Sequence, residues 1–172
     1  MKEKFLKILR DRSTSRVAFR EAADKLGILM AEEIHVEKAT LVPILRAGIA
    51  LLHPFQKKFP AAPIGFLGIR RDEKTALPHL YYENLPPLTE QILILDPMLA
   101  TGGSANLAID RLKSKGAKHI HLISVIASRD GIEAIKKRHQ DIKIYSVAID
   151  ETLDADKFIV PGLGDFGDRY FS

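Results

Sequence analysis

The sequence predicts an α/β protein built on an open parallel sheet flanked by helices. Short apolar runs alternate with helical patterns along most of the chain, and the apolar runs are uniformly rather than alternately hydrophobic. Uniform hydrophobicity is typical of strands that are buried on both faces, as parallel strands are. Helical segments between such strands favour right-handed crossover connections. Ligands of these sheets bind beyond the carboxyl ends of the strands, so we expect the site there.

The N-terminal part, residues 1–39, is predicted to be helical, and it precedes a core sheet over residues 40–150 and a tail over residues 151–172. A chain of 172 residues is long enough for one domain with a substantial core. Residues 13–15, Ser-Thr-Ser, can cap a helix. Its apolar residues recur at helical spacing, at Val17, Phe19, Ala22, Ala23, Leu26 and Met30.

Five apolar runs are expected to form the strands of the core sheet. The first, third and fourth lead into helical patterns, and the second leads into a polar stretch. Arg46, Asp96 and Asp150 stand at strand ends, and this placement is the first indication of a functional site. The runs cover residues 40–45, 63–69, 92–96, 121–127 and 143–149.

Composition narrows the classes of protein that the chain can represent. The absence of Cys excludes disulfides and thiolate metal sites and favours a cytoplasmic location. No apolar run approaches the roughly 18 residues that a membrane span needs, so we expect no membrane partner. The net charge of +4 suits an anionic partner.

Two clusters of basic and histidine residues are explained without a binding function. Lys136, Lys137 and Arg138 are expected at a helix C-terminus, where cations favour the dipole, so we expect no nucleic-acid partner. His119 and His121 share one strand face, but no third metal ligand is evident. We therefore interpret both histidines as surface or edge residues.

The stretch DPMLATGGS, residues 96–104, joins an apolar run to a helical pattern and carries an acid, a threonine and two glycines. Amides at a helix start have no partner within the helix, and with the helix dipole they can bind an anion. Glycines allow close approach of a phosphate, and Asp96 could accept hydrogen bonds from ribose hydroxyls. These features predict a ribose 5-phosphate site. The alternative is an ordinary strand-to-helix turn capped by Ser104.

The tail contains a second glycine pattern, GLGDFG, at residues 162–167. It matches the dinucleotide fingerprint GxGxxG, but the sequence leaves no room after it for the helix that should bind a pyrophosphate, so we reject that interpretation. We expect Asp165 to lie in a non-helical tail, where Asp is often a turn former.

DPMLATGGS resembles the phosphoribosyl-diphosphate loop of the uracil phosphoribosyltransferases, which belong to the type I phosphoribosyltransferases. VPILRAG, GIRRDEKT and IVPGLGDFGDRYF, at residues 42–48, 68–75 and 159–171, are similar to further motifs of that family. The resemblance implies the expected fold with a small C-terminal hood that recognises the base. It also implies conversion of uracil and phosphoribosyl diphosphate (PRPP) to UMP and diphosphate, with Mg²⁺.

The resemblance further implies roles for particular residues. Asp96, Asp165 and Arg71 would be catalytic, and backbone groups of Ile159, Gly164, Asp165 and Phe166 would read uracil. PRPP would be bound by Arg46, Arg71, Asp96, Pro97, Met98, Leu99, Ala100, Thr101, Gly102, Gly103, Ser104 and Asp165.

The motif also bears on the metal. Many related transferases place two adjacent acids at the head of the loop, whereas Pro97 follows Asp96 here. We therefore expect Mg²⁺ to be held mainly by the substrate diphosphate and water, with no protein ligand.

Only six residues separate Glu33 from Thr40, where the family usually has a longer segment with a β-arm that embraces a partner subunit. We expect a short family member that still forms a homo-oligomer, with GTP as a possible effector. Two alternatives remain. One is a regulatory protein of this fold that senses uracil nucleotides and binds RNA with little turnover, although the sequence lacks the aromatic-interleaved basic stripes typical of RNA binding. The other is a transferase for a purine base.

Overall fold

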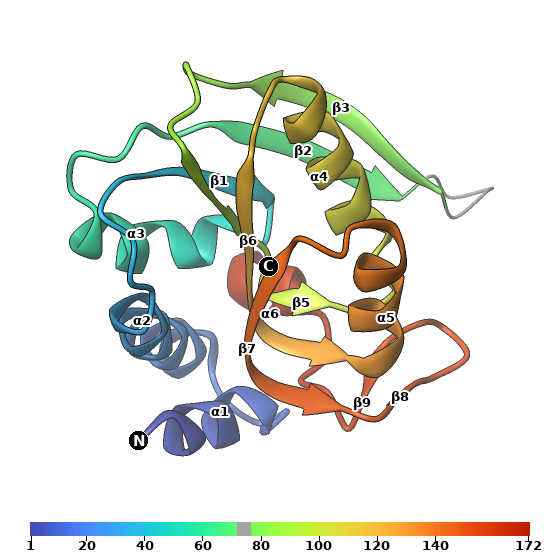
Figure 1. The fold of residues 1–172 in the computed structure, drawn as a ribbon. Helices are drawn as coiled ribbons and strands as arrows, with labels where there is room; N and C mark the ends of the chain where they lie inside the picture. Colours follow the sequence, from blue (N-terminus) through green and yellow to red (C-terminus); the bar gives the residue numbers. More distant parts are fainter. Residues whose placement is uncertain (72–76) are drawn as a thin grey trace.

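The computed structural model describes residues 1–71 and 77–172. A seven-stranded sheet lies at its centre, with helices on both faces and a small two-stranded sheet near the C-terminus (Figure 1). The elements in chain order are α1 (Lys2–Arg10), α2 (Arg16–Glu32), β1 (Ala39–Leu45), α3 (Ile49–Lys58), β2 (Phe66–Arg71), β3 (Pro78–Asn84), β4 (Gln91–Leu95), β5 (Met98–Leu99), α4 (Gly103–Ser114), β6 (His119–Ser128), α5 (Arg129–Arg138), β7 (Lys143–Asp150), β8 (Thr152–Leu153), β9 (Ile159–Val160) and α6 (Phe166–Phe171).

The strand order confirms the predicted open parallel sheet. The strands run β3-β2-β1-β4-β6-β7, and the short β5 pairs with β6 beyond the end of β4. All these pairs are parallel except β2 with β3. The antiparallel β3 was not predicted, because its side chains are polar or half-exposed at most positions. It is an edge strand, and such a strand needs no continuous apolar run.

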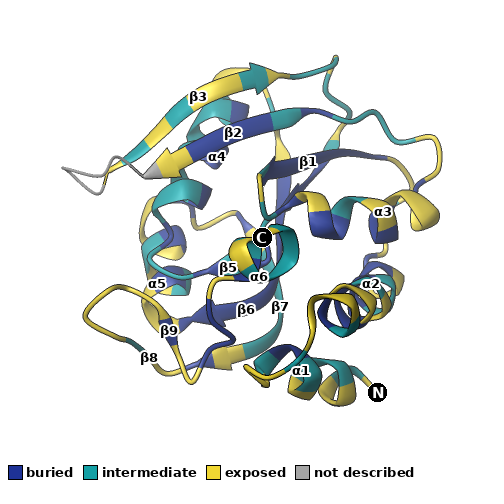
Figure 2. Ribbon diagram, turned by 180° about the vertical axis from the view of Figure 1, so that it is seen from behind, coloured by how far each residue is buried: buried dark blue, intermediate teal, exposed yellow. Residues whose placement is uncertain are grey.

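Alternate residues of the central strands build two apolar layers. Leu41, Leu93 and Leu95 face α1, α2, α3 and the C-terminal tail. Val42, Ile92 and Ile94 face α4 and α5. Figure 2 shows β1 and β6 as almost wholly buried, in agreement with their uniformly apolar sequences.

The N-terminal region is helical, as expected. Ser15 caps α2 by accepting a hydrogen bond from the backbone N–H of Ala18. Every apolar position predicted for this helix is buried except Val17, which is 68% exposed in its first turn. Residues 33–38 alone connect α2 to β1, so the connection is as short as the sequence indicates.

The interpretation of His121 as a surface or edge residue is wrong. Its ring is buried, stacks on Tyr145 and places Nε2 2.8 Å from Oε1 of Gln91. Burial lowers the pKa of His121 below its usual value, so the ring packs as a neutral group. Within residues 1–71 and 77–172 no three metal-ligating side chains come together. Over the same ranges no helix is long and apolar enough to cross a bilayer.

Candidate active site

A cleft of about 330 Å³ opens beyond the carboxyl ends of β1 and β4. Three separate segments contribute most of it, the end of β1 with the turn after it, the loop between β4 and α4, and the C-terminal tail, and β2 adds Ile69. Of the residues predicted from the sequence, Arg46, Asp96, Met98, Ala100, Ser104 and Asp165 line it. The structure therefore has a cleft at the carboxyl ends of the parallel strands, where the sequence predicts a ligand site.

The turn after β1 is held in place by close packing of its backbone. The N–H of Gly48 donates to the carbonyl of Ile44 over 2.9 Å. A Cβ at position 48 would lie 2.2 Å from the carbonyl oxygen of Leu95, so only glycine fits there. The turn presents Arg46 to solvent at the mouth of the cleft, with its guanidinium 3.7 Å from the carboxylate of Asp168. Both partners are more than half exposed, so this ion pair is weak and easily exchanged for another anion.

The loop of residues 96–104 is attached to β6 along its length. The N–H of Asp96 donates to Ile123, and the carbonyl of Pro97 accepts from Val125 and Ile126 at 2.9 and 3.1 Å. Gly102 then takes a left-handed conformation, with φ of +77°, at the N-cap position of α4. The alternative of a helix capped by Ser104 is therefore wrong, because Ser104 lies inside the first turn.

A small hollow of about 40 Å³ lies within this loop, lined by Asp96 and residues 98–105. We call it the loop hollow. It lies at the start of α4, where backbone amides have no partners within the helix and the dipole favours an anion. Its geometry fits the predicted phosphate site.

The expectation that Asp165 lies in a non-helical tail is wrong. Asp165 is the N-cap of α6, and its carboxylate accepts a hydrogen bond of 2.8 Å from the N–H of Asp168. The phenyl ring of Phe166 is buried against Phe19 and Tyr170, with centroids 5.0 and 6.0 Å away. Its ring therefore faces the core, and only its backbone is directed toward the loop, where its N–H lies 3.4 Å from Sδ of Met98.

The remaining residues expected to read uracil lie behind the surface of the cleft. Ile159 is buried in β9, where it pairs with Leu153. Gly164 has φ of +82°, and a Cβ there would meet the guanidinium of Arg12 at 2.2 Å. At Gly164 the backbone of the tail thus packs tightly against the connection between α1 and α2. Of the residues expected to read uracil, Asp165 lines the cleft.

Asp150, expected at the ligand-binding edge, has a structural role instead. Its buried carboxylate accepts two hydrogen bonds from Arg10, at 2.8 and 2.6 Å, and one from the N–H of Gly162 at 2.9 Å. Arg10 in the first place, and Gly162 in the second, lower the pKa of Asp150 below its usual value. The end of β7 therefore anchors the tail.

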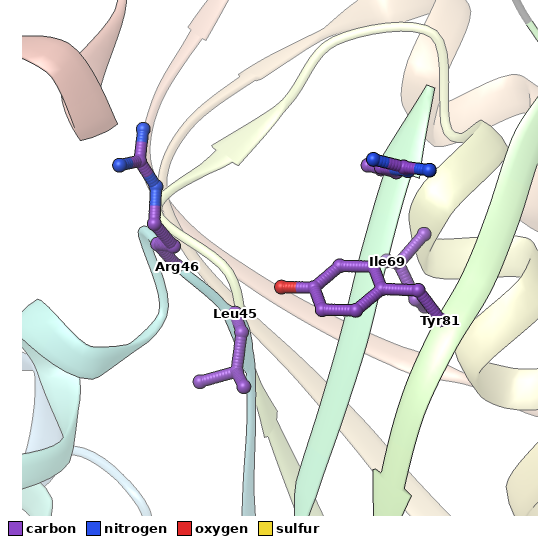
Figure 3. A pocket seen from close by; sticks show the side chains of 5 residues that line it. Leu45, Arg46, Ile69 and Tyr81 are labelled. Carbon is purple, nitrogen blue, oxygen red and sulfur yellow. The ribbon is translucent and has the colours of Figure 1, made fainter. Parts of the chain in front are cut away.

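A second hollow of about 310 Å³ adjoins the cleft, and we call it the side hollow. Leu45, Arg46 and Ile69 line both spaces, and Arg70 and Tyr81 complete the side hollow. Figure 3 shows Tyr81 extending across β2 with its hydroxyl directed toward Leu45 and Arg46. The guanidinium of Arg70 lies over the Tyr81 ring, 5.9 Å from its centroid. Arg71 is the last residue of β2, and its side chain lies outside the described part of the structure.

In the tail, sequence reasoning missed three residues that line the cleft: Asp156, Lys157 and Phe158. They belong to the connection between β8 and β9, which was assigned to the tail without naming any of them. A signal was available, because Asp154 at the start of this connection is a residue type that often organises a turn. Its Oδ1 accepts hydrogen bonds of 2.9 Å from the N–H groups of Asp156 and Phe158.

Comparison with known proteins places the chain in a family. The family model for uracil phosphoribosyltransferase matches residues 33–172. A protein of that name from Oceanobacillus iheyensis is 42% identical, with 96% of this chain and 91% of the relative covered. The corresponding Lactococcus lactis protein is also 42% identical, with 96% and 92% covered. The Oceanobacillus alignment runs over 191 positions against 172 residues in this chain, as expected for a short family member.

Solved structures agree with the sequence comparison. The AQ2163 protein from Aquifex aeolicus superimposes with a TM-score of 0.92 at 31% identity, over 99% of this chain and 93% of that chain. A purine phosphoribosyltransferase from Pyrococcus horikoshii, at 16% identity and a TM-score of 0.59 over 76% and 84% of the two chains, shares the fold. The family match over residues 33–172, the identity to the bacterial relatives and the cleft beyond the parallel strands agree, and the chain belongs to the uracil phosphoribosyltransferase family.

Proposed function

We propose that this enzyme transfers the 5-phosphoribosyl group of PRPP to N1 of uracil, with UMP and diphosphate as products. The observation that carries this proposal is the cleft, which brings Arg46, the loop of residues 96–104 and Asp165 together from three distant parts of the chain. Family membership supports uracil as the base, since the relatives that match over most of the chain bear that name.

The loop hollow would take the 5-phosphate of the donor. Backbone amides at the start of α4 and the hydroxyls of Thr101 and Ser104 would donate to the phosphate oxygens. Asp96, at the head of the loop, would accept hydrogen bonds from the ribose hydroxyls. Met98 and Leu99 hold the loop against β6 through β5, and the carbonyl of Ala100 accepts a hydrogen bond from the hydroxyl of Ser128, so the sugar would be positioned on a rigid support.

Arginine side chains would bind the diphosphate. The guanidinium of Arg46 stands at the mouth of the cleft, and its weak pair with Asp168 can give way to a phosphate. Arg71 is assigned to the same group by resemblance. A fixed guanidinium fork fits phosphate oxygens and stabilises the negative charge that grows on the leaving group.

The residues of the cleft fit the expected magnesium ion. Three acidic residues line the cleft: Asp96 comes from the loop after β4, and Asp156 and Asp165 come from the tail. Oxygen ligands suit Mg²⁺, which commonly keeps several waters and binds through substrate phosphates. Asp96 and Asp165 would contribute at most through water, and the bound ion would neutralise part of the diphosphate charge.

The tail would orient uracil through backbone groups. The side chains of Ile159 and Phe166 are buried and Gly164 has none, so these residues would reach the edge of the base through their N–H and C=O groups. During transfer the N1–C1′ bond forms and the bond from C1′ to the diphosphate oxygen breaks. The uracil N1 proton passes to water or to a backbone group of the tail.

The test is to incubate the purified protein with PRPP, Mg²⁺ and a panel of bases, and to identify nucleotide products by chromatography. We expect UMP from uracil and no nucleotide from hypoxanthine, guanine or adenine. IMP or GMP would assign a purine transferase, and the absence of any product would favour the regulatory alternative. Homo-oligomer formation, activation by GTP and a cytoplasmic location stay predictions.

A further inference from the structure

The connection between β8 and β9 holds a lysine in an unusual backbone conformation. Lys157 has φ of +67°, and over residues 1–71 and 77–172 the other residues with positive φ are glycines. An L side chain rarely adopts this left-handed conformation, and glycine adopts it without steric cost. A residue of this kind beside a cleft is a reason to look for a function of its side chain.

Hydrogen bonds around Asp154 fix this conformation. Its Oδ1 accepts from the N–H groups of Asp156 and Phe158, and its own N–H donates to the carbonyl of Phe158, each over 2.9 Å. The N–H of Lys157 donates to the carbonyl of Asp154 over 3.0 Å. All four bonds use the Asp154 carboxylate or backbone groups. A glycine at position 157 would therefore serve the turn better, and the lysine must be explained by its side chain.

Lys157 is an exposed residue that lines the cleft on the side that the tail forms. Its charged neighbours among the tail residues of the cleft are Asp156 and Asp165, both acids. Among the residues that the structure describes, Arg46 is the other cation lining the cleft; it comes from the turn after β1 and lies beside Asp168 and Phe171 of α6. The donor phosphates already have the loop hollow and the arginines. Lys157 is thus the cation that the tail supplies on the base side of the cleft.

We propose that the ammonium group of Lys157 donates a hydrogen bond to a carbonyl oxygen of uracil and stabilises the negative charge that the base acquires as N1 loses its proton. This inference rests on the proposed function. The proton passes to water, N1 forms its bond to C1′, and the diphosphate leaves with the electron pair of the broken C1′–O bond. The charge left by the proton spreads over N1 and the carbonyl oxygens, where a positioned cation stabilises it.

Replacement by glycine separates this role from a structural one. Lys157→Gly removes the cation and relieves the backbone, so we expect a melting temperature equal to or above that of the wild type. Loss of a hydrogen bond to a charged group should lower kcat/KM for uracil about 10- to 100-fold. The KM for PRPP should stay within about twofold, because the donor phosphates bind elsewhere.

Two matched variants complete the measurement. Lys157→Arg keeps a cation at the same place and should retain most of the activity. Ala155→Gly loosens the same connection without removing a charge, and Ala155 is an exposed residue outside the cleft lining, so its kinetics should match the wild type. A loss in Ala155→Gly equal to that in Lys157→Gly would assign the effect to the backbone and overturn the proposal.

Comparing bases of different acidity distinguishes the two roles of Lys157, because a purely structural role would affect every base equally. Fluorine withdraws electrons, so 5-fluorouracil loses its N1 proton more readily than uracil and depends less on the lysine. The ratio of kcat/KM for 5-fluorouracil to that for uracil should therefore rise in Lys157→Gly. An unchanged ratio, or a loss confined to the KM for PRPP, would overturn this inference and leave the proposed function intact. A wild-type protein that makes no UMP would overturn both.

Discussion

Arg46 and Asp168 meet at the mouth of the cleft as an exposed pair, 3.7 Å apart, with 65% and 68% of their side chains accessible. Exposed pairs of this kind contribute about 0–1 kcal/mol to stability. The charge of Arg46 is therefore not needed by the fold. At the scale of single residues, it stands in solvent at the place where the diphosphate of the donor is expected.

Arg46→Ala should lower kcat about 100- to 1000-fold, the usual range for loss of one group that stabilises transition-state charge. Its melting temperature should change by no more than a few degrees, because the lost ion pair is weak. Steady-state kinetics and thermal unfolding measure the two effects. A large fall in melting temperature would instead assign Arg46 a structural role.

The control for this variant is Arg138→Ala. Arg138 is 61% exposed and pairs with Asp110 at 2.6 Å, on the helices α4 and α5. It matches Arg46 in exposure and is also paired with an aspartate, more tightly than Arg46, but it does not line the cleft. Its activity should equal that of the wild type, and a loss comparable to that of Arg46→Ala would contradict the assignment.

At the scale of elements, the turn between β1 and α3 depends on one glycine for a steric reason. Gly48 has an ordinary helical φ of −59°, so its conformation alone would accept any residue. The restriction comes from the carbonyl oxygens of Leu95 and Ile44, which a Cβ would meet at 2.2 and 2.7 Å. Gly116 is the opposite case, with φ of +89° and no atom within 4 Å of the place that a Cβ would occupy.

These two glycines separate a steric penalty from a conformational one. Gly116→Ala should cost about 1–2 kcal/mol, the usual penalty for a left-handed residue. Gly48→Ala should cost about 3 kcal/mol or more, since backbone atoms must move. It should also displace Arg46 and lower activity. Urea unfolding and kinetics on both variants test this, and equal costs with unchanged activity would contradict the packing argument.

Across the whole molecule, the N-terminal helices hold the C-terminal tail in place. Arg10 of α1 binds Asp150 at the end of β7 and the carbonyl of Gly162 in the tail. Arg169 of α6 also links the two ends of the chain, since it donates to the carbonyls of Asp11 and Leu163 over 2.7 Å each. Its guanidinium also lies 4.3 Å from the centroid of the Phe19 ring. The tail side of the cleft is therefore positioned by residues from the opposite end of the chain.

The pair of Arg10 and Asp150 should make stability depend on pH in acid. The pKa of Asp150 is lowered in the folded protein, chiefly by Arg10, from an ordinary value of 3.8. Its stabilisation is therefore fully present above pH 3.8 and is lost as the pH falls through the folded pKa. Arg10→Met should cost about 3 kcal/mol at pH 7, because the Asp150 carboxylate is buried.

Urea unfolding of Arg10→Met and the wild type at pH 7 and at pH 3 measures this dependence. The difference between the two proteins should shrink at the lower pH, because pH 3 lies below the ordinary value of 3.8, under which the stabilisation by the pair begins to be lost. Arg129→Met, which removes an exposed pair with Glu151, is the control and should show little difference at either pH. A cost of Arg10→Met that stays constant with pH would contradict the role of the pair.

Much of the fold and part of the site could be predicted from local sequence patterns. The buried strands, the capped helix after Ser15 and the loop of residues 96–104 are each specified by neighbouring residues, through uniform hydrophobicity, a capping side chain and small residues before a helix. The resemblance added the family and the order of its motifs. Arg46, Asp96 and Ser104 line the cleft as a consequence of these local features, whereas Asp165 reaches it on a tail that distant residues hold.

Other features depend on residues far apart in the chain, and only the tertiary structure decided them. Asp150 stands at a strand end like Asp96, but its carboxylate is hydrogen-bonded to Arg10, 140 positions away. His121 is buried because Tyr145 and Gln91 pack against it, and Phe166 turns its ring into the core because Phe19 is there. A local pattern specifies backbone conformation and which face is apolar, because both depend on adjacent residues. Which polar group is paired inside and which one faces the cleft depends on long-range packing, and so does the place of Lys157 at the cleft.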